Sequence, residues 1–490
     1  MNLYDLTIVE AHKGLTEKTF SASELLQSSL GRIDALEPTL HAFLSLHSET
    51  AIEHAKAVDE KIAKGHDIRV LEGIPAAIKD NILIQSTVAT AASKILEHYR
   101  SSYSATVIKK LESQGATVVG KTNLDEFAMG SSTENSAYGP SKNPWDSQRV
   151  PGGSSGGSAV SVASGEATYA LGTDTGGSIR QPAALCGVVG LKPTYGQVSR
   201  YGAIAMASSL DQIGPITRTV EDAAIVYDAI RGADTYDSTT AHATPILEPT
   251  KLHTDLKGVR IGIPKEYFIE GIDPRVEASV RAAAKEFESN GAVLVDISLP
   301  HSSYALAVYY IIMPAEVCSN MSRYDGIRYG ARDKEAKDLW KTYTSSREKG
   351  LGAEVRRRVM LGTYVLSAGY ADQYYNQAQQ VRSLIRRDFD HAFSKVDCIL
   401  TPTSPSPAFK FGEKTDDPLT MYLEDIFTVS ANIAGVPALA LPCGFVEEGG
   451  KQLPVGMQLF GKHFDEASIL SVGHAYQQFT DWHTRRPIIS

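Results

Sequence analysis

Cysteine is scarce in this chain of 490 residues, and none of its four cysteines stands in a Cys-x-x-Cys pair. Such scattered cysteines predict neither a disulfide framework nor a zinc site, and they suit a reducing compartment. No segment reaches the roughly 18 uninterrupted apolar residues that a membrane span needs. The first residues include Asp5 and Glu10 and lack the basic-then-apolar order of a secretory signal. These absences predict a cytoplasmic protein with no metal site.

A net positive charge is also missing, since 48 Lys and Arg face 57 Asp and Glu, for a formal charge of −9. This balance argues against direct, charge-driven binding of nucleic acid, although residues 356–358 are a local basic run. Hydrophobic residues make up 42% of the chain, which is enough for a large core. The length alone suggests about three domains, but large α/β enzymes often build one long sheet.

Strand-like and helix-like segments alternate over most of the first 232 residues, which predicts a parallel sheet with helices on both faces. Ser21 and Glu24 form a capping-box pattern at the start of a helix that Pro38 is expected to end. The chain divides into an N-terminal helical segment (1–65), a core (66–232), a linker-like stretch (233–257), a helical insertion (about 301–390) and a C-terminal sheet portion (391–490). We predict one α/β domain over residues 1–490, with a central mixed, mainly parallel sheet.

Two short segments rich in glycine and serine are the most informative feature of the sequence. They read Gly-Gly-Ser-Ser-Gly-Gly-Ser over 152–158 and Asp-Thr-Gly-Gly-Ser-Ile-Arg over 174–180. Glycine lets the backbone approach a ligand, serine can attack or relay a proton, and N–H groups at a strand-to-helix turn can hold an oxyanion. Flanking apolar runs argue against a linker, and neither segment ends in the Gly-Lys-Ser/Thr of a phosphate loop. The pattern predicts acyl transfer, with Ser154 and Ser178 as candidate serines.

A serine nucleophile needs a base, and histidine is nearly absent from this part of the chain. His98 is the only histidine in the stretch 73–202, and it stands in no recognisable motif. Lysine can serve if burial lowers its pKa from about 10.4. Lys79 follows an apolar run (74–78) that would carry it inward. On spacing alone, a lysine that reaches solvent or pairs with Asp80 is the commoner outcome.

A competing motif lies at residues 115–122, where Gly-Ala-Thr-Val-Val-Gly-Lys-Thr matches the Walker A pattern letter for letter. A phosphate loop follows a strand and opens a helix. Here a helix expected over 104–114 precedes the first glycine, and the loop interior is a β-forming run. We interpret Gly115 as a helix C-cap and 116–119 as a strand, which leaves a nucleotide-binding module as a remote alternative.

Two charged residues are ambiguous on composition alone. Arg358 ends the basic run, where a solvated helix face is as consistent with the pattern as a binding site. Asp425 lies in the amphipathic segment 422–427, where a helix cap or a surface position fits equally well. Neither residue acquires a function from its local sequence.

The sequence resembles the amidase signature family in the order and spacing of its motifs. The matching motifs are residues 73–80, 151–158, 172–182 and 186–194. The resemblance implies a Ser–Ser–Lys triad in which Ser178 is the nucleophile and Ser154, preceded by a cis peptide, relays its proton to Lys79. The oxyanion hole that it implies consists of the backbone N–H groups of Thr175, Gly176, Gly177 and Ser178.

Beyond these motifs, the likeness is greatest to one branch of the family, the glutamine-hydrolysing A subunits of bacterial aspartyl/glutamyl-tRNA amidotransferases. The matching segments are 123–132, 142–146, 208–212, 323–326 and 454–458. By this resemblance, Arg358 and Asp425 hold the carboxylate and ammonium of glutamine, with Tyr309 close by. Arg357 and Tyr310 are adjacent and leave the assignment open.

The same resemblance implies partners and a division of labour. The chain would release ammonia from glutamine within a heterotrimer with subunits B and C. A partner subunit would use ATP and Mg to amidate Glu-tRNA(Gln), Asp-tRNA(Asn) or both, and would hold most of the tRNA. No cofactor is implied in this chain. A free-standing carboxamide amidase is the alternative, and a hydrolase of hydrophobic amides would not need Arg358 with Asp425.

Overall fold

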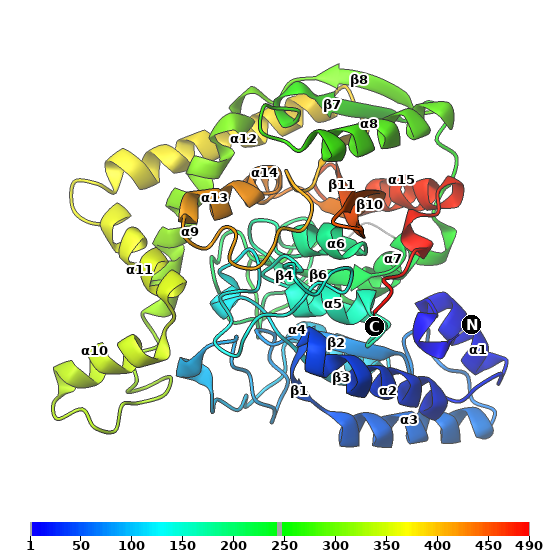
Figure 1. The fold of residues 1–490 in the computed structure, drawn as a ribbon, viewed down its shortest axis with the longest axis horizontal. Coiled ribbons are helices and arrows are strands. Elements are labelled where there is room, and N and C mark those ends of the chain that lie inside the picture. Colours follow the sequence, from blue (N-terminus) through cyan, green and yellow to red (C-terminus); the bar gives the residue numbers. More distant parts are fainter. Residues whose placement is uncertain (1, 243–246, 490) are drawn as a thin grey trace.

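Eleven strands of the described chain form one sheet that runs from the bottom to the top of the molecule in Figure 1. The computed structural model describes residues 2–242 and 247–489. The strands are β1 (Phe43–Leu46), β2 (Pro75–Lys79), β3 (Thr117–Thr122), β4 (Tyr169–Asp174), β5 (Val189–Lys192), β6 (Gln212–Thr217), β7 (Arg260–Pro264), β8 (Val293–Ile297), β9 (Cys398–Pro402), β10 (Ala438–Glu448) and β11 (Lys451–Phe460). Their order across the sheet is β1-β3-β2-β4-β6-β5-β10-β11-β9-β7-β8.

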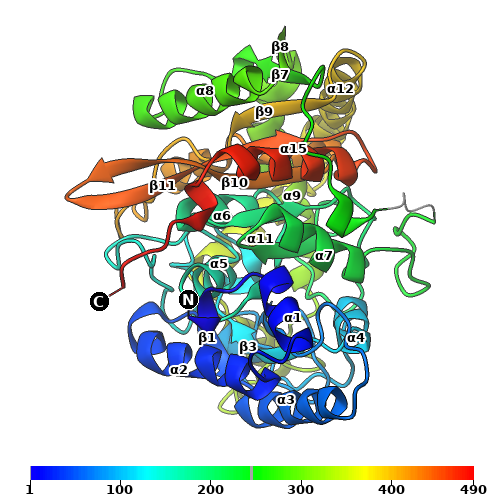
Figure 2. The same cartoon turned by 90° about the vertical axis from the view of Figure 1, so that its right-hand side faces the viewer.

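Fifteen α-helices in the described chain surround this sheet and cover both of its faces (Figure 2). They are α1 (Ile8–Thr16), α2 (Ala22–Leu40), α3 (Ser48–Ala63), α4 (Thr106–Ser113), α5 (Gly156–Ala163), α6 (Arg180–Cys186), α7 (Val220–Ile230), α8 (Pro274–Ser289), α9 (Ala305–Met321), α10 (Leu339–Gly350), α11 (Ala353–Val365), α12 (Gln377–Phe393), α13 (Pro418–Tyr422), α14 (Val429–Ala434) and α15 (Glu466–Phe479). None of these helices is long and apolar enough to cross a membrane.

The sheet is mixed, as the sequence predicts, but it is not mainly parallel. Of its ten neighbouring strand pairs in the described chain, six are antiparallel and four are parallel. The parallel pairs lie near the two ends, where α4 links β2 to β3 and α8 links β7 to β8. The central strands β4, β6, β5, β10, β11 and β9 pair antiparallel. The prediction was wrong there because alternating strand and helix signals do not specify which strands pair.

Local signals at helix ends are confirmed with one correction. Ser21 and Glu24 form the predicted capping box at the start of α2. Pro38 does not end that helix, which continues to Leu40 and stops where His41 adopts a left-handed conformation. In the expected linker at 233–257, residues 243–246 lie outside the described part of the chain.

The helical insertion forms an arm along the left margin of the molecule in Figure 1. Helix α11 packs on α9, while α12 contacts both α9 and α14. These contacts join the arm to the segment that returns the chain to the sheet. A side chain from the arm reaches the loop after β4, where Tyr309 of α9 lies against Gly176.

Candidate functional site

Lys79 is the last residue of β2, a strand whose five residues are all buried between β3 and β4. Its Nζ lies 2.8 Å from Ser154 Oγ, 2.8 Å from Ser155 Oγ and 2.9 Å from Thr173 Oγ1. Lys79 is completely buried, so the solvated alternative is excluded. Pairing with Asp80 is excluded too, because the Asp80 carboxylate accepts from Lys121 instead, at 2.9 Å.

Burial lowers the pKa of Lys79 to about 7, because the charged form loses its hydration. The buried carboxyl groups of Asp125, Asp174 and Asp211 oppose this change without cancelling it. A neutral amine has a lone pair and can accept a proton through the hydroxyl that it contacts. Lys79 is thus suited to act as a general base near neutral pH.

Ser154 and Ser155 lie at the turn into α5, and the peptide bond between Gly153 and Ser154 is cis. Both serines are completely buried, and every residue of α5 is buried as well, which explains why small residues fill this segment. Ser155 N donates to Ser178 O at 3.1 Å. The two Gly/Ser segments therefore lie side by side, as a shared site requires.

Ser178 lies in the loop between β4 and α6 and keeps 8% of its surface exposed, whereas Ser154 and Ser155 have none. Within the described chain, its hydroxyl makes no hydrogen bond. Of these three serines, it is the one that a substrate can reach. A free hydroxyl beside a lysine-bound serine is suited to nucleophilic attack.

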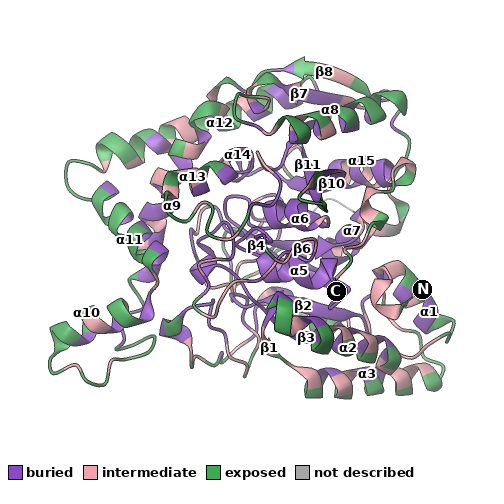
Figure 3. Ribbon diagram, in the orientation of Figure 1, coloured by how far each residue is buried: buried purple, intermediate pink, exposed green. Residues whose placement is uncertain are grey.

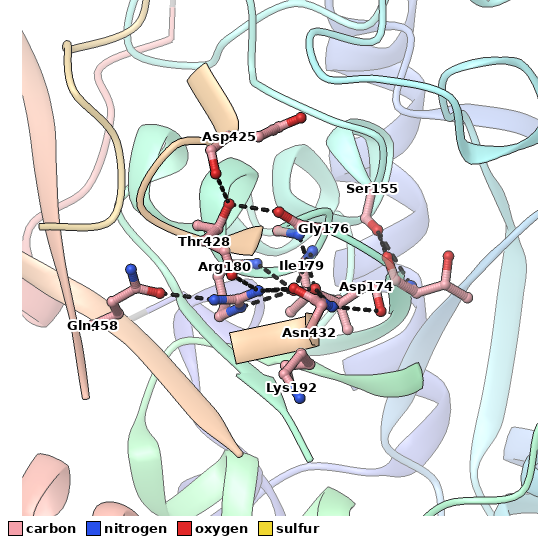
Figure 4. A network of polar contacts seen from close by, with 12 residues as sticks. Ser155, Asp174, Gly176, Ile179, Arg180, Lys192, Asp425, Thr428, Asn432 and Gln458 are labelled. Atoms are coloured by element: carbon pink, nitrogen blue, oxygen red, sulfur yellow. Dashed lines mark hydrogen bonds and ion pairs between the residues drawn. The ribbon is translucent and has the colours of Figure 1, made fainter. Parts of the chain in front are cut away.

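The loop that carries Ser178 is held by an ion pair between Asp174 and Arg180, both completely buried (Figure 4). Arg180 Nε lies 3.0 Å from Asp174 Oδ2, and Gly177 N donates to Asp174 Oδ1 at 2.9 Å. Burial would raise the pKa of Asp174, but Arg180, together with Lys192 and Asn432, outweighs it and lowers that pKa to about 2. Arg180 also binds Asn432 and Gln458, so the loop is fixed from both sides.

Three of the four amides expected in the oxyanion hole remain available. The N–H groups of Thr175, Gly176 and Ser178 donate to no acceptor in the described chain, whereas Gly177 N–H is occupied by Asp174. A Cβ added to Gly176 would lie 2.6 Å from the Tyr309 hydroxyl oxygen, so Tyr309 contacts this loop closely. The three amides without an acceptor and the tyrosine that contacts Gly176 thus all lie in or against the loop that carries Ser178.

Arg358 lies on the buried face of α11, while Arg357 is half-exposed on the outer face. Arg358 Nε donates to Glu354 at 2.7 Å, and Nη2 donates to Gly130 O at 2.8 Å. Burial alone would lower the pKa of Arg358, but Tyr310 and Glu354 outweigh it and raise that pKa above its usual value. Arg358 therefore stays charged and, unlike Arg357, points into the protein.

Asp425 is buried at the end of a short 3-10 turn (Leu423–Asp425), where Tyr310 donates to its carboxylate at 3.0 Å. Burial raises the pKa of Asp425 to about 7, and the Tyr310 hydroxyl opposes that shift. Thr428 donates to Asp425 O at 3.1 Å and to Gly176 O at 2.6 Å (Figure 4). The acid is thereby tied to the loop that carries Ser178, and both Tyr309 and Tyr310 lie at the site.

The Walker-like segment is no phosphate loop in this structure. Residues 117–122 form β3, and Gly115 follows the end of α4 with a φ of +77°. Lys121 is completely buried and bound to Asp80. No group of three or more His, Cys, Asp or Glu side chains is placed to hold a metal ion in residues 2–242 and 247–489.

The comparisons with known proteins agree with this geometry. The family model "Amidase" matches residues 24–470. The chain is 56% identical over 487 residues to the A subunit of the glutamyl-tRNA(Gln) amidotransferase from Carboxydothermus hydrogenoformans, covering 99% of this chain and 100% of that relative. The crystal structure of the corresponding A subunit from Thermotoga maritima has a TM-score of 0.82 at 42% identity and covers 100% of this chain and 99% of that one. The chain belongs to the amidase signature family.

The fold is shared beyond these relatives. A 6-aminohexanoate cyclic dimer hydrolase has a TM-score of 0.86 at 23% identity, covering 100% of this chain and 99% of that one. At this identity the likeness concerns the fold alone, so the choice of substrate must be argued from the side chains of this chain.

Several residues of the site were not predicted from the sequence. Ser155 and Thr173 contact Lys79, and Glu354 holds Arg358. Asp174 and Arg180 stand at the two ends of the second Gly/Ser segment. Their opposite charges at a spacing of six residues were the signal that could have suggested an ion pair bracketing the loop.

Proposed function

We propose that this chain hydrolyses the side-chain amide of glutamine and supplies the ammonia to a tRNA-dependent amidotransferase, of which it is the glutaminase subunit. The observation that carries the proposal is the buried Lys79–Ser154 contact beside the accessible Ser178. The names of the relatives, which are A subunits of glutamyl-tRNA(Gln) amidotransferases, support the same activity.

The reaction begins with attack of Ser178 Oγ on the amide carbon. The Ser178 proton passes to Ser154, whose own proton passes to neutral Lys79. The amides of Thr175, Gly176 and Ser178 receive the developing oxyanion, which refines the expected hole by leaving Gly177 out. The proton on Lys79 returns through Ser154 to the leaving nitrogen, and ammonia departs. Water then attacks the acyl-enzyme, assisted by the same relay, and releases glutamate.

Glutamine carries an α-carboxylate and an α-ammonium, and the site contains a candidate group of opposite charge for each of them. Arg358 is a buried cation whose charge suits the α-carboxylate. Asp425 is a buried acid, and an arriving ammonium would favour its ionised form. Tyr309 lies against Gly176 in the Ser178 loop. A simple carboxamide would need neither charge, which favours an amino-acid substrate over a free-standing amidase of hydrophobic amides.

The ammonia has an acceptor in this proposal. We assign the chain to a heterotrimer with subunits B and C, in which a partner subunit binds ATP and Mg and holds the tRNA. Glu-tRNA(Gln) is the acceptor that the names of the relatives support, and Asp-tRNA(Asn) is a second candidate. We expect this assembly to be cytoplasmic, where tRNA is amidated for protein synthesis.

The test is glutamine hydrolysis by the purified chain, alone and with subunits B and C, followed as glutamate and ammonia release. Glutamine-dependent amidation of Glu-tRNA(Gln) by the complex supports the full proposal. Hydrolysis of simple amides with no preference for glutamine, under both conditions, would instead identify a free-standing amidase. Asp-tRNA(Asn) in a parallel assay decides whether one or both tRNAs are acceptors.

A further inference from the structure

Helix α11 presents two different faces. Its inner face, with Glu354, Arg358 and Gly362, is buried against α9 and the site. Its outer face carries Met360, 72% exposed, and Tyr364, 48% exposed. An outward helix face is usually polar, so large apolar side chains there require an explanation.

The apolar surface continues beyond α11. Tyr364 lies 4.5 Å from Tyr370 between ring centres, and Tyr370 lies 5.9 Å from Tyr374. We name this surface the α11 outer face; its residues are Met360, Leu361, Tyr364, Leu366, Tyr370 and Tyr374, all exposed. In Figure 3 it belongs to the exposed margin formed by α10, α11 and the turn that follows. Clusters of exposed aromatic and Met side chains mark protein interfaces.

We propose that the α11 outer face is the docking surface for a partner polypeptide of the amidotransferase, an inference that rests on the proposed function. The partner segment is apolar at its centre and acidic at its edge. Helices α10 and α11, over residues 339–365, hold six Lys or Arg against two Glu, for a net charge of +4, in a chain whose net charge is −9. An acidic edge complements this local charge.

Other occupants fit the surface less well. Binding of nucleic acid depends on cations that meet phosphates, and none of the six side chains that define the α11 outer face is a cation. The centre of the surface is aliphatic and aromatic. A second copy of this chain, related by two-fold symmetry, would bring two net-positive faces together. A distinct acidic polypeptide avoids both difficulties.

The α11 outer face is linked to the glutamine site through the carboxylate of one residue, Glu354. Glu354 binds Arg358 on the inner face through Oε1 and Arg357 on the outer side through Oε2. Glu354 also accepts from the Tyr422 hydroxyl at 2.8 Å. A partner that covers the outer face holds α11, and with it Arg358, in one position. Docking therefore lowers the KM for glutamine and changes kcat little.

The experiment compares Met360→Glu/Tyr364→Glu with Tyr304→Glu, a control at an aromatic position that is 58% exposed outside this surface. Each full-length protein is titrated with subunits B and C, and affinity is measured by fluorescence anisotropy. We expect the double variant to bind about tenfold more weakly or worse, with wild-type affinity in the control. Circular dichroism and glutaminase activity of the isolated double variant should match the wild type, which excludes misfolding.

Unchanged partner affinity in the double variant would overturn the proposal. So would loss of self-association, or of binding to tRNA alone, with partner binding intact, because these results would identify a second copy or RNA as the occupant. A KM for glutamine that partners leave unaltered would overturn the coupling through Glu354. If the wild type bound its partners but hydrolysed no glutamine, the proposed function would fail while the docking measurement still stood.

Discussion

The groups proposed to carry the reaction and those proposed to select the substrate come from different parts of the chain. Lys79 ends β2, Ser178 lies in the loop after the neighbouring strand β4, and Ser154 lies at the turn into α5. Arg358 comes from the helical arm, and Asp425 from the segment that returns to the sheet. The difference shows how one fold can keep its amide chemistry and change its substrate, because the selecting residues lie outside the strands that hold the nucleophile.

The two regions also shift the pKa of a buried basic side chain in opposite directions. Lys79 has hydroxyl neighbours and, in the described part of the chain, no carboxylate in contact, so burial lowers its pKa to about 7. Arg358 has Glu354 at 2.7 Å, and its pKa is raised. A base must lose its proton and a carboxylate receptor must keep its charge. The immediate partners, rather than the depth of burial, decide between these outcomes.

Ser178→Ala should have the largest effect of the series, and it should abolish the reaction while leaving glutamine binding almost unchanged. Removing the nucleophile should lower glutamine hydrolysis by several orders of magnitude, because the covalent route is lost. Binding of glutamine, measured by calorimetry, should remain within a few-fold of wild type since Arg358 and Asp425 are intact. The complex should still amidate tRNA from free ammonia. Near-normal hydrolysis by this variant would remove Ser178 from the mechanism.

Arg358→Ala should affect the selecting region next most strongly. Loss of one partner of a desolvated charge pair costs roughly 2–5 kcal/mol, or about 30-fold to a few thousand-fold in kcat/KM for glutamine. A simple aliphatic amide has no carboxylate, so its kcat/KM should change far less. Comparing the two substrates in steady-state assays gives the answer. Equal losses on both substrates would indicate that Arg358 stabilises the fold rather than binding glutamine, and would favour the alternative of a free-standing amidase.

The sequence predicted that Lys79, Ser154 and Ser178 share one site because they lie in the short, ordered motifs by which the chain resembles the amidase signature family. Lys79 and Ser178 are brought together by β2 and β4, which are neighbours in the sheet, and Ser154 joins them from the turn into α5. The pairing of distant central strands was not predictable in this way, since apolar runs of similar length can pair in either direction. That is why the mixed sheet was expected to be mainly parallel, whereas six of its ten neighbouring strand pairs in the described chain are antiparallel.

The selecting region needed the structure. Arg357 and Arg358 are indistinguishable in sequence, but the spacing of Glu354, Arg358 and Gly362 places Arg358 on the buried face of α11. The direction of a single N–H group is also invisible in sequence. Gly177 donates to Asp174 although it stands in the middle of the expected oxyanion hole.

The pH dependence of hydrolysis tests the reacting region separately, because it depends on Lys79 as the base. Lys79 must be neutral to accept a proton, so with its pKa at about 7 the kcat/KM for a simple amide should fall about tenfold per unit below pH 7 and level off above pH 8. Between about pH 7 and pH 10.5, Lys79 binds a proton in the unfolded chain but not in the folded one. The free energy of unfolding should therefore increase with pH over this range. A simple amide is used because it avoids titration of Asp425. Lys79→Arg should be inactive throughout, and a wild-type limb near pH 5 or pH 10 would contradict the assignment.

Asp425→Asn should have a smaller effect than Arg358→Ala. The amide keeps the shape and can still accept a hydrogen bond, but it loses the charge, and charge-assisted bonds are roughly twice as strong as neutral ones. We expect the KM for glutamine to rise about tenfold, with kcat little changed. Amides that lack the α-amino group should be hydrolysed as by the wild type. A matching loss on those amides would show that Asp425 supports the Ser178 loop through Thr428 rather than binding the ammonium.

Arg357→Ala should have the smallest effect of the series and thereby fix which arginine binds glutamine. Its guanidinium is half-exposed and reaches Glu354 from the outer side of α11. Exposed ion pairs contribute roughly 0–1 kcal/mol, so the kcat/KM of the isolated chain should change about fivefold at most. Glu354 keeps its bond to Arg358 and therefore still orients it. Assaying the isolated chain removes any contribution from partner docking. If Arg357→Ala instead raised the KM as much as Arg358→Ala, the carboxylate would be bound from the outer face of α11, and the separation of reacting and selecting regions would have to be redrawn.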